Sequence, residues 1–477
     1  MNIAFFCIPA HGHTNPTLAV VRELTARGHT VRYYTTEAFR AKVEAAGAVF
    51  VPFDTEAARP GMTAADGARL GSDLAFSTKL IVDLTLAADD WLSRELTVHR
   101  PDVIVGDSMA FWAKLAAKKH GIPFVSSTTT FAFNRFSAKV IGQNGAGFLQ
   151  FLLAQPRINR QLKRLRAAGY TAKSVFDIIA NDNETETVVY TSPEFQPCAD
   201  TFSEKYHFVG PLLRPAQSSF EKLPGRSLIY ISLGTVNNDA LPFYRACLAA
   251  FGGDPRFQLV LSAGTQTDLA ALGPIPESCT VRASVDQMAV LDCADVFLTH
   301  CGMNSASEGL WHGLPLVLYP QTPEQHGVAN RVAALGAGVP LTDPSADGIR
   351  RAVEAALTDP AYRENAQKLA GGFHRCGQDI RADAIPPALA GAVQQRQLRH
   401  FGNHLTRGTL PAFGKGFRNF IVQPAQPRRL YRIVIIVAIP GGHAEQLPDS
   451  QVRILGIPEL RPISCHRAVQ LQFALLP

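Results

Sequence analysis

The feature that most constrains the fold is a repeated alternation of short apolar segments with segments that have the apolar spacing of a helix. Strands that alternate with helices of this length predict a parallel sheet with helices on both faces. In the first half, we predict strands at Ile3–Ile8, His29–Tyr34, Val103–Gly106 and Phe124–Ser127, and helices at Thr17–Arg27, Arg40–Ala46 and Ala110–His120.

The alternation restarts after Val209–Arg226, a segment whose proline and turn-forming residues are typical of a linker. We therefore predict an α/β fold of two Rossmann-like domains, residues 1–212 and 227–393, joined by a linker at 213–226. Ligands of such sheets bind at the carboxyl ends of the strands, so two such edges facing a cleft would make a two-substrate site. The strands predicted in the second half are Leu228–Ser232, Gln258–Ser262, Val296–Thr299 and Leu316–Tyr319.

Residues 394–477 do not continue this pattern. They hold eleven Arg and Lys against three Asp and Glu, which gives +8, so the rest of the chain carries −2 of the formal +6. The apolar run Ile433–Ile439 has no predicted helix or partner strand beside it to form a βα unit. A solvated basic tail, or frame-shifted sequence, explains this segment at least as well as a third domain. We expect it to be non-catalytic and poorly folded.

Composition indicates an ordinary globular protein. Of the 477 residues, 46% are hydrophobic and 18% charged, which excludes a disordered chain. The eight cysteines form no C-x-x-C pair, as expected in a reducing compartment. No signal peptide and no run of about 18 apolar residues is apparent. We expect a cytoplasmic protein, monomeric or weakly dimeric, with no nucleic-acid partner and no stable membrane insertion.

The most informative stretch for function runs from His300 to Glu308, directly after a predicted strand. Gly302, Asn304 and Ser305 place small residues in the first turn of a predicted helix, where backbone N–H groups and the helix dipole face an anion. The imidazole of His300 adds a donor. Glu308, about two turns further along, is placed to accept hydrogen bonds from a ribose. The stretch predicts a nucleotide-diphosphate site that needs no metal.

Two histidines, His11 and His13, follow the first predicted strand. They are two residues apart in a predicted tight turn, so we expect one of them to face the cleft, although both could be exposed loop residues. A neutral imidazole is a suitable general base. Asp107, which ends another strand, could orient that imidazole or cap the next helix. We predict Asn15 as the N-cap, and Pro16 in the first turn, of the helix that follows the histidines.

Weaker signals come from polar and aromatic residues near other strand ends. Thr235 offers a hydroxyl for phosphate contact, as many strand-to-helix turns do. Glu324 and Gln325 offer adjacent acceptor and amide groups, which hexose hydroxyls require, or simply begin a polar helix. There is no Asp-x-Asp triplet, zinc spacing, P-loop lysine or G-x-S-x-G elbow. Residues that could line an apolar acceptor pocket, or belong to the core, are Met109, Phe111, Trp112, Phe124, Phe131 and Phe133.

Taken together and in this order, the motifs resemble the inverting, two-Rossmann-domain (GT-B) glycosyltransferases that use UDP-sugars. The resemblance is strongest to the bacterial macrolide glycosyltransferase family, and it runs from Met1 to about Cys376. The motifs that carry it are Gly12–Pro16, Pro101–Val103 with Asp107, Val209–Pro211, Ser232–Thr235, Asp286–Gln287 with Val290–Leu291, His300–Glu308 and Pro320–Gln325.

The resemblance implies a role for each matching residue. It implies that His13 is the catalytic base, Asp107 its carboxylate partner and Glu308 the ribose-binding carboxylate. It also implies that the N-terminal domain binds the acceptor and the C-terminal domain the nucleotide sugar. The remaining implied donor residues are His300, Gly302, Asn304, Ser305 and Thr235 for the diphosphate, Gln287 near the base, and Glu324 and Gln325 for the sugar.

The sequence departs from the family pattern at two places. Plant relatives carry a tryptophan that stacks on uracil where this chain has Ser284, so the resemblance specifies UDP over TDP less firmly. The family's final helix, which crosses back to the N-terminal domain, is expected near Gln378–Val393, where Pro386-Pro387 interrupts it.

The resemblance thus predicts an inverting, metal-independent transfer of a hexose from a UDP-sugar, for which UDP-glucose is the first candidate. The acceptor would be a hydroxyl of a hydrophobic small molecule such as a macrolide, a flavonoid or another natural product. No cofactor is expected, because the UDP-sugar is a co-substrate. Two alternatives stay open: a catalytically silent nucleotide-sugar-binding protein and a UDP-sugar epimerase on the same scaffold.

Overall fold

The computed structural model describes residues 1–53, 73–134, 136–137, 146–181, 183–235 and 238–379, and three strands within 420–473. These residues form two separate units, Met1–Gln394 and Gln395–Pro477. The first unit contains two parallel-sheet α/β halves, so the predicted fold class is confirmed. The domain boundaries given above stay predictions.

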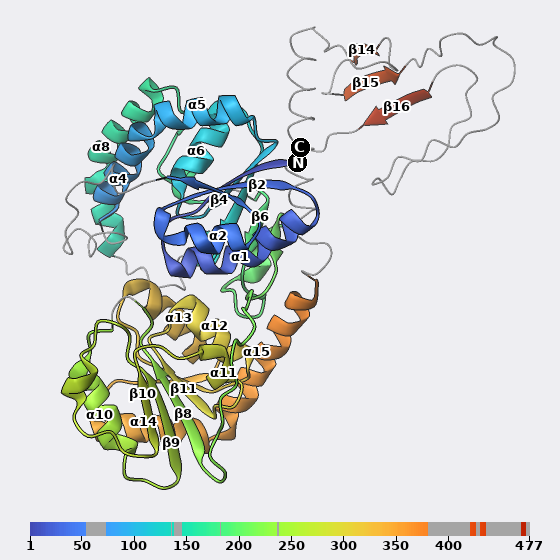
Figure 1. Cartoon of the computed structure of the whole chain (residues 1–477). Coiled ribbons are helices and arrows are strands. Elements are labelled where there is room, and N and C mark those ends of the chain that lie inside the picture. The colour runs from blue at the N-terminus through green and yellow to red at the C-terminus, as the bar shows by residue number, and fades with distance from the viewer. Residues whose placement is uncertain are drawn as a thin grey trace, which may run out of the picture. The chain divides into compact units, whose positions relative to one another are not determined.

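The N-terminal half is built on a seven-stranded parallel sheet in the order β3-β2-β1-β4-β5-β6-β7 (Figure 1). The first strand, β1, lies inside the sheet, because β2 and β4 pair with its two sides. The strands are β1 (Asn2–Phe6), β2 (Thr30–Thr35), β3 (Val49–Pro52), β4 (Val103–Asp107), β5 (Phe124–Thr128), β6 (Thr187–Val189) and β7 (Tyr206–Phe208).

Helices cover both faces of this sheet, which is why the central strands are apolar at nearly every position. Apolar side chains of α1 and α2 pack on one face, and those of α5 and α6 pack on the other. Helices α4 and α8 pack against each other and add an outer layer over α6. The helices are α1 (His11–Ala26), α2 (Arg40–Ala45), α4 (Leu74–Ala87), α5 (Asp89–His99), α6 (Phe111–His120), α8 (Ala146–Ala167) and α9 (Phe176–Ile179).

The C-terminal half repeats the plan with a six-stranded parallel sheet in the order β10-β9-β8-β11-β12-β13. Helices α10 and α14 cover one face, while α12, α13 and α15 cover the other. The strands are β8 (Ser227–Ser232), β9 (Phe257–Ser262), β10 (Cys279–Arg282), β11 (Val296–Thr299), β12 (Leu316–Leu318) and β13 (Gly338–Pro340). The helices are α10 (Leu241–Phe251), α11 (Gln287–Leu291), α12 (Met303–Trp311), α13 (Pro323–Ala334), α14 (Ala346–Thr358) and α15 (Pro360–Asp379).

The predicted start of the first helix is wrong. Helix α1 begins at His11 and not near Thr17, its N-cap is Ala10 and not Asn15, and Pro16 lies inside it. A proline at this position has no N–H to donate to the carbonyl of Gly12, four residues earlier. That carbonyl instead accepts a hydrogen bond from the side-chain amide of Asn304 in the C-terminal half, at 3.1 Å. A long-range partner thus replaces the missing helical bond.

The second unit contains a small antiparallel sheet. The statement that the run Ile433–Ile439 lacks a partner strand is wrong, because β15 (Leu430–Ile435) pairs with β14 (Phe420–Ala425) and β16 (Val469–Phe473). The partners were missed because antiparallel pairing needs no intervening helix. The interrupted helix expected at Gln378–Val393 falls almost wholly outside the described residues.

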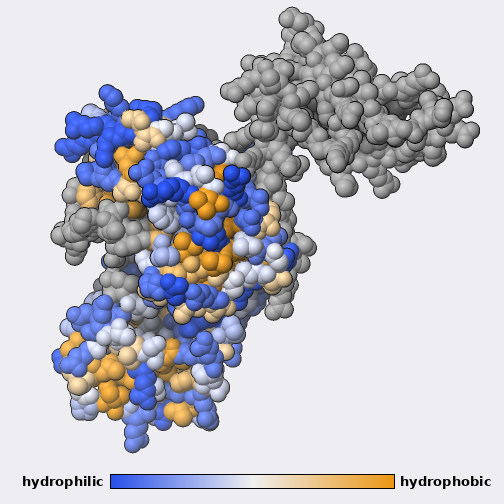
Figure 2. All heavy atoms as spheres, turned by 45° about the horizontal axis from the view of Figure 1, so that its top comes forward, coloured by the Kyte–Doolittle hydropathy of each residue, from blue (hydrophilic) through white to orange (hydrophobic). Residues whose placement is uncertain are grey.

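The described surface is that of a globular protein. On the face shown in Figure 2, hydrophilic side chains dominate and apolar ones lie in small groups between them. Among the helices that the structure describes, none has the length and apolar character needed to cross a membrane.

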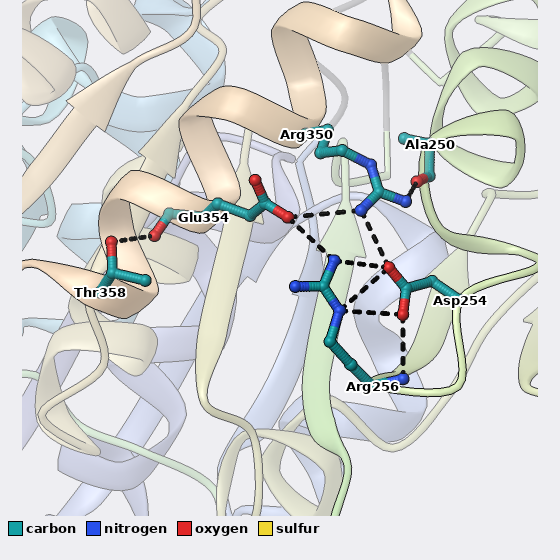
Figure 3. Close-up of polar contacts among 6 residues, drawn as sticks. All are labelled: Ala250, Asp254, Arg256, Arg350, Glu354 and Thr358. Atoms are coloured by element: carbon teal, nitrogen blue, oxygen red, sulfur yellow. Dashed lines mark hydrogen bonds and ion pairs between the residues drawn. The ribbon is translucent and has the colours of Figure 1, made fainter.

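At the amino ends of the C-terminal strands, a network of charged side chains joins α14 to the loop before β9 (Figure 3). The carboxylate of Asp254 accepts hydrogen bonds from Arg256 at 2.6 Å and from Arg350 at 3.0 Å. Both arginines also reach Glu354, at 3.2 and 3.3 Å. These charged groups pair with one another at the amino ends of the strands. The ligand is predicted at the opposite, carboxyl ends, which are called the carboxyl edge of the sheet below.

Candidate active site

The predicted base and carboxylate meet at the carboxyl edge of the N-terminal sheet. His13 lies in the first turn of α1, directly after β1, and Asp107 is the last residue of β4, the strand beside β1. The Nδ1 atom of His13 lies 2.8 Å from Oδ2 of Asp107, whose side chain is fully buried. The other oxygen, Oδ1, accepts a hydrogen bond from the backbone N–H of Met109 at 2.9 Å. Asp107 therefore contacts the histidine and also fastens the turn after β4, but it does not cap α6, whose N-cap is Ala110 and has no side-chain capping bond.

Only one of the two histidines takes part in this pair. The ring of His11 is exposed at the surface and packs against Phe39, 5.0 Å between ring centroids. The side chain of His13 is 14% exposed. Because the Asp107 carboxylate can only accept a hydrogen bond, Nδ1 of the neutral His13 ring carries the proton. Nε2 is then left as the acceptor. This is the tautomer that a general base requires.

The pKa of His13 is raised above its ordinary value. Burial alone would lower it, but the charge of Asp107 and the hydrogen bond to that carboxylate outweigh the burial, and the charge of Glu324 adds to them. Glu324 begins α13 in the C-terminal half. The carboxyl edges of the two sheets therefore act electrostatically on the same imidazole.

The turn between β11 and α12 is tightly packed around His300. A Cβ atom added to Gly302 would lie 2.6 Å from Nε2 of His300, and one added to Gly234 would be equally close to the same ring. Cys301, which lies between His300 and Gly302 in the sequence, has a φ of 62°, in the left-handed region that non-glycine residues rarely adopt. Two glycines and one strained residue thus hold the imidazole at the start of α12.

This turn has the groups that an anion needs. Gly302, the N-cap of α12, makes no side-chain capping bond, so the first N–H groups of the helix have no capping side chain. Burial lowers the pKa of His300 to about 4, which makes the imidazole a neutral donor at pH 7. Its Nδ1 is buried without a hydrogen-bond partner among the described residues. Asn304 and Ser305 follow in the first turn, both half-buried, and Thr235 lies exposed after β8.

The residues predicted for the ribose and the base contact each other directly. Glu308 accepts a hydrogen bond from the side-chain amide of Gln287, and Tyr230 donates to Oε1 of Gln287 at 2.9 Å. Burial raises the pKa of Glu308, whereas the Gln287 bond and the positive charge of Arg214 in the linker oppose this rise. The carboxylate and the amide are thus fixed side by side on α12 and α11.

The predicted sugar-binding pair begins α13. Glu324 is exposed, and Gln325 takes part in a capping box with Thr322. The Oε1 atom of Gln325 accepts the backbone N–H groups of Gln321 at 2.8 Å and Thr322 at 3.2 Å. Gln325 therefore begins a polar helix, which was the alternative to a sugar-binding role.

Comparison with known proteins identifies the family. Residues 257–375 match the family described as Erythromycin biosynthesis protein CIII-like, C-terminal domain. The NDP-glycosyltransferase YjiC of Bacillus licheniformis is 32% identical over 403 residues, which cover 81% of this chain and 99% of that protein. The demethyllactenocin mycarosyltransferase of Streptomyces fradiae is 33% identical over 407 residues, which cover 82% of this chain and 87% of that protein. The crystal structure of the glycotransferase of kitacinnamycin aligns with a TM-score of 0.68 and 29% identity, covering 84% of this chain and 98% of its own.

The chain belongs to the NDP-glycosyltransferase family. This glycosyltransferase has the two-sheet GT-B architecture of its relatives and transfers a sugar from a nucleotide sugar. The resemblance noted in the sequence is confirmed. The roles assigned to individual residues stay predictions, as does the absence of a cofactor. Among the residues that the structure describes, no three His, Cys, Asp or Glu side chains gather as a metal site.

The six residues suggested for the acceptor pocket divide into three groups. Trp112 and Phe131 are core residues, 2% and 9% exposed. Phe111 and Phe124 are half-buried and pack against core clusters. Met109 and Phe133 are exposed, at 47% and 36%. Of the six, only Met109 and Phe133 present substantial surface to an acceptor in this structure.

Sequence reasoning missed two contacts of the glycosyltransferase site. The hydroxyl of Thr129, just after β5, lies 2.9 Å from Nδ1 of His13, so it shares that nitrogen with Asp107. The carboxylate of Asp286 accepts the backbone N–H groups of Gln217 at 2.6 Å and Ser218 at 2.9 Å, which fastens the linker to the nucleotide loop. The run of hydroxyl residues at 126–130 was a signal for the first contact, whereas nothing local indicated the second.

Proposed function

We propose that this glycosyltransferase transfers a hexose, with inversion and without a metal ion, from UDP-glucose or a related UDP-sugar to a hydrophobic alcohol or phenol. The observation that carries the proposal is the 2.8 Å contact between His13 Nδ1 and Asp107 at the edge of the N-terminal sheet. This contact leaves Nε2 of His13 free to take a proton from an acceptor hydroxyl. A base on the acceptor side supports direct displacement at the anomeric carbon.

The proposed reaction is a single displacement. Nε2 of His13 removes the acceptor proton as the acceptor oxygen attacks the anomeric carbon, and the bond from that carbon to the diphosphate oxygen breaks. Asp107 stabilises the imidazolium that forms. An α-linked donor would give a β-glycoside. After the displacement, the proton is on His13 and the bonding electrons are on the departing UDP.

The leaving group is proposed to depart toward the first turn of α12. The helix dipole, the uncapped N–H groups and the neutral imidazole of His300 are donors that take up developing negative charge without a cation. These groups support metal independence. Glu308, held by Gln287, is proposed to accept the ribose hydroxyls. Glu324 and the amide of Gln325 are proposed to bind the sugar.

The acceptor class rests on two lines of support. The names of two relatives contain the natural products demethyllactenocin and kitacinnamycin. Met109 and Phe133 offer exposed apolar side chains after β4 and β5, on the same sheet edge as His13. A macrolide, a flavonoid or another apolar natural product suits such a surface.

The test is a mass-spectrometric assay with UDP-glucose and a mixed panel of phenols and macrolides, with and without EDTA. We expect a product heavier by one hexosyl unit whose yield EDTA does not change, and NMR of that product should show the β-linkage. Loss of product with EDTA would refute metal independence. UDP binding with no transfer would favour a silent binding protein, and conversion of UDP-glucose to another UDP-hexose without acceptor would favour an epimerase.

A further inference from the structure

The segment Glu194–Gln196 of the N-terminal half inserts into the core of the C-terminal half. The ring of Phe195 is completely buried, in the cluster formed by α12, α13 and α15. It packs against Phe131 of its own half at 5.2 Å and against Phe373 of α15 at 5.6 Å. Three aromatic rings from three parts of the chain thus meet where the two halves join.

A single arginine of α13 holds the backbone of this segment. The Nε atom of Arg331 donates to the carbonyl of Phe195 at 2.9 Å, and Nη2 donates to the carbonyls of Glu194 at 2.8 Å and Gln196 at 3.4 Å. The planar guanidinium is rigid and presents several donors at fixed angles, which a lysine cannot reproduce. Arg331 is therefore matched to three successive carbonyl groups.

The same segment reaches the loop next to the catalytic pair. The side chain of Gln196, which is 1% exposed, accepts the N–H of Ala132 at 2.9 Å and donates to its carbonyl at 3.0 Å. Three residues earlier in that loop, the hydroxyl of Thr129 lies 2.9 Å from Nδ1 of His13. Hydrogen bonds and short stretches of chain thus connect α13 to the imidazole.

We propose that Arg331 is a positioning residue, which sets the donor-side helix α13 at a fixed place relative to the acceptor-side loop 129–134 and His13. It acts through the Glu194–Gln196 segment and touches neither substrate. Glu324 and Gln325 stand at the start of the helix that carries Arg331 about two turns further along. A shift of α13 would therefore move the predicted sugar contacts relative to the base.

The contacts of Arg331 and Phe195 join the two halves entirely through residues that the structure describes. Only the kinetic consequence of this inference rests on the proposed function, because the contacts between the two halves are present in the protein without ligand.

The first test is hydrogen–deuterium exchange of the full chain without nucleotide, comparing wild type with R331A, R331K and R375A. Arg375 is the matched control, because it also reaches the segment, at the Glu194 carboxylate, but through an exposed ion pair of 2.7 Å that should contribute little. We expect exchange in residues 128–134 to rise about tenfold in R331A, less in R331K and not measurably in R375A. Unchanged exchange in R331A would show that Arg331 does not hold the loop 129–134 in place.

The second test separates binding from chemistry. With UDP as the probe, we expect R331A to bind with an affinity within about twofold of wild type, while kcat for transfer falls about tenfold because donor and base are misaligned. R331K should fall between R331A and wild type, and R375A should match wild type. Equal kcat in R331A and wild type would overturn the positioning role. Failure of wild-type protein to bind UDP would count against the proposed function and leave the exchange test intact.

Discussion

The two ends of strand β4 carry aspartates with opposite properties. Asp102, just before the strand, accepts the backbone N–H of Asn2 at 2.8 Å in an exposed position. Asp107, at the carboxyl end, is buried against the imidazole of His13. The first contact links two strand starts, whereas the second holds the ionisable ring of His13. The same residue type thus serves structure at one edge of the sheet and is suited to chemistry at the other.

The C-terminal sheet shows the same contrast between its edges. At the amino edge, Asp254, Arg256 and Arg350 satisfy one another (Figure 3). At the carboxyl edge, Nδ1 of His300 is buried without a partner among the described groups, and Cys301 is strained. Unsatisfied polar groups and backbone strain cost stability, and they persist where a ligand completes them. In the C-terminal half, the unpaired nitrogen of His300 and the strained Cys301 lie together at the carboxyl edge, where a ligand is predicted.

Replacement of His13 should have the largest effect. We expect His13→Ala to lower kcat for transfer by about 10²–10⁴-fold, because no group then accepts the acceptor proton. UDP affinity should stay nearly unchanged, since His13 belongs to the other sheet. Transfer kinetics and calorimetric UDP titration check both points. A comparable loss of UDP binding would show that His13 is structural and would remove the contrast between the two ends of the sheet.

Asp107→Asn should change both the rate and its pH dependence. The base must be neutral, and the pKa of His13 is raised, so wild-type transfer should fall as the pH drops through that raised pKa. Removing the carboxylate charge lowers the pKa, so the acid limb of kcat/KM against pH should move to lower pH. The rate at neutral pH should fall roughly 100-fold, because the imidazole loses its orienting partner.

The matched control for this variant is Asp102→Asn at the other end of β4. It should leave the pH profile where it is in wild type, because Asp102 contacts only backbone in the described structure. An acid limb that stays in place in Asp107→Asn would mean that Asp107 does not set the titration of His13.

Gly302→Ala should weaken nucleotide binding. A Cβ at this position would lie 2.6 Å from Nε2 of His300, so the imidazole must move away from the start of α12. We expect UDP affinity to fall about tenfold, as crowding of a packed site commonly costs. Gly253→Ala is the control at the amino edge, because a Cβ there meets nothing within 4 Å. Calorimetry on both variants decides whether the crowding matters only at the ligand edge.

The fold was predictable from sequence because burial on both faces makes each strand apolar over a short, contiguous run. Segments such as Val296–Thr299 and Leu228–Ser232 carry that signal locally, and the structure has strands there. Strands β3, β6, β7, β10 and β13 were missed. Of these, Thr187–Val189 is very short, and Gly338–Pro340 contains two strand-breaking residues.

The site was predictable only where motif and position coincide. The places of His13 and Asp107 at strand ends allowed their pairing and the family resemblance implied it, whereas only the structure shows that their strands, β1 and β4, are neighbours. The start of α1 could not be deduced, because the group that compensates for Pro16 is Asn304, 292 residues from the Gly12 carbonyl it binds. The contact of Thr129 with His13 spans 116 residues. Such partners come together only after folding, so the run of hydroxyl residues at 126–130 did not indicate which group Thr129 contacts.

The smallest effect is expected at the amino edge, from Asp254→Asn. Hydrogen bonds from Arg256 and Arg350 hold the pKa of Asp254 well below its usual range, so the charged carboxylate contributes stability above the unfolded-state pKa of about 3.9. That contribution is lost as the pH falls below this value. Solvent screens the network, since the Arg256 side chain is 64% exposed. We therefore expect the midpoint of thermal unfolding at pH 7 to fall by no more than about 3 °C, and transfer activity to stay at the wild-type level. The difference in midpoint should shrink at acidic pH, because the wild-type carboxylate then loses its charge. A loss of activity in Asp254→Asn with intact UDP binding would mean that the amino ends of the strands influence catalysis at their carboxyl ends.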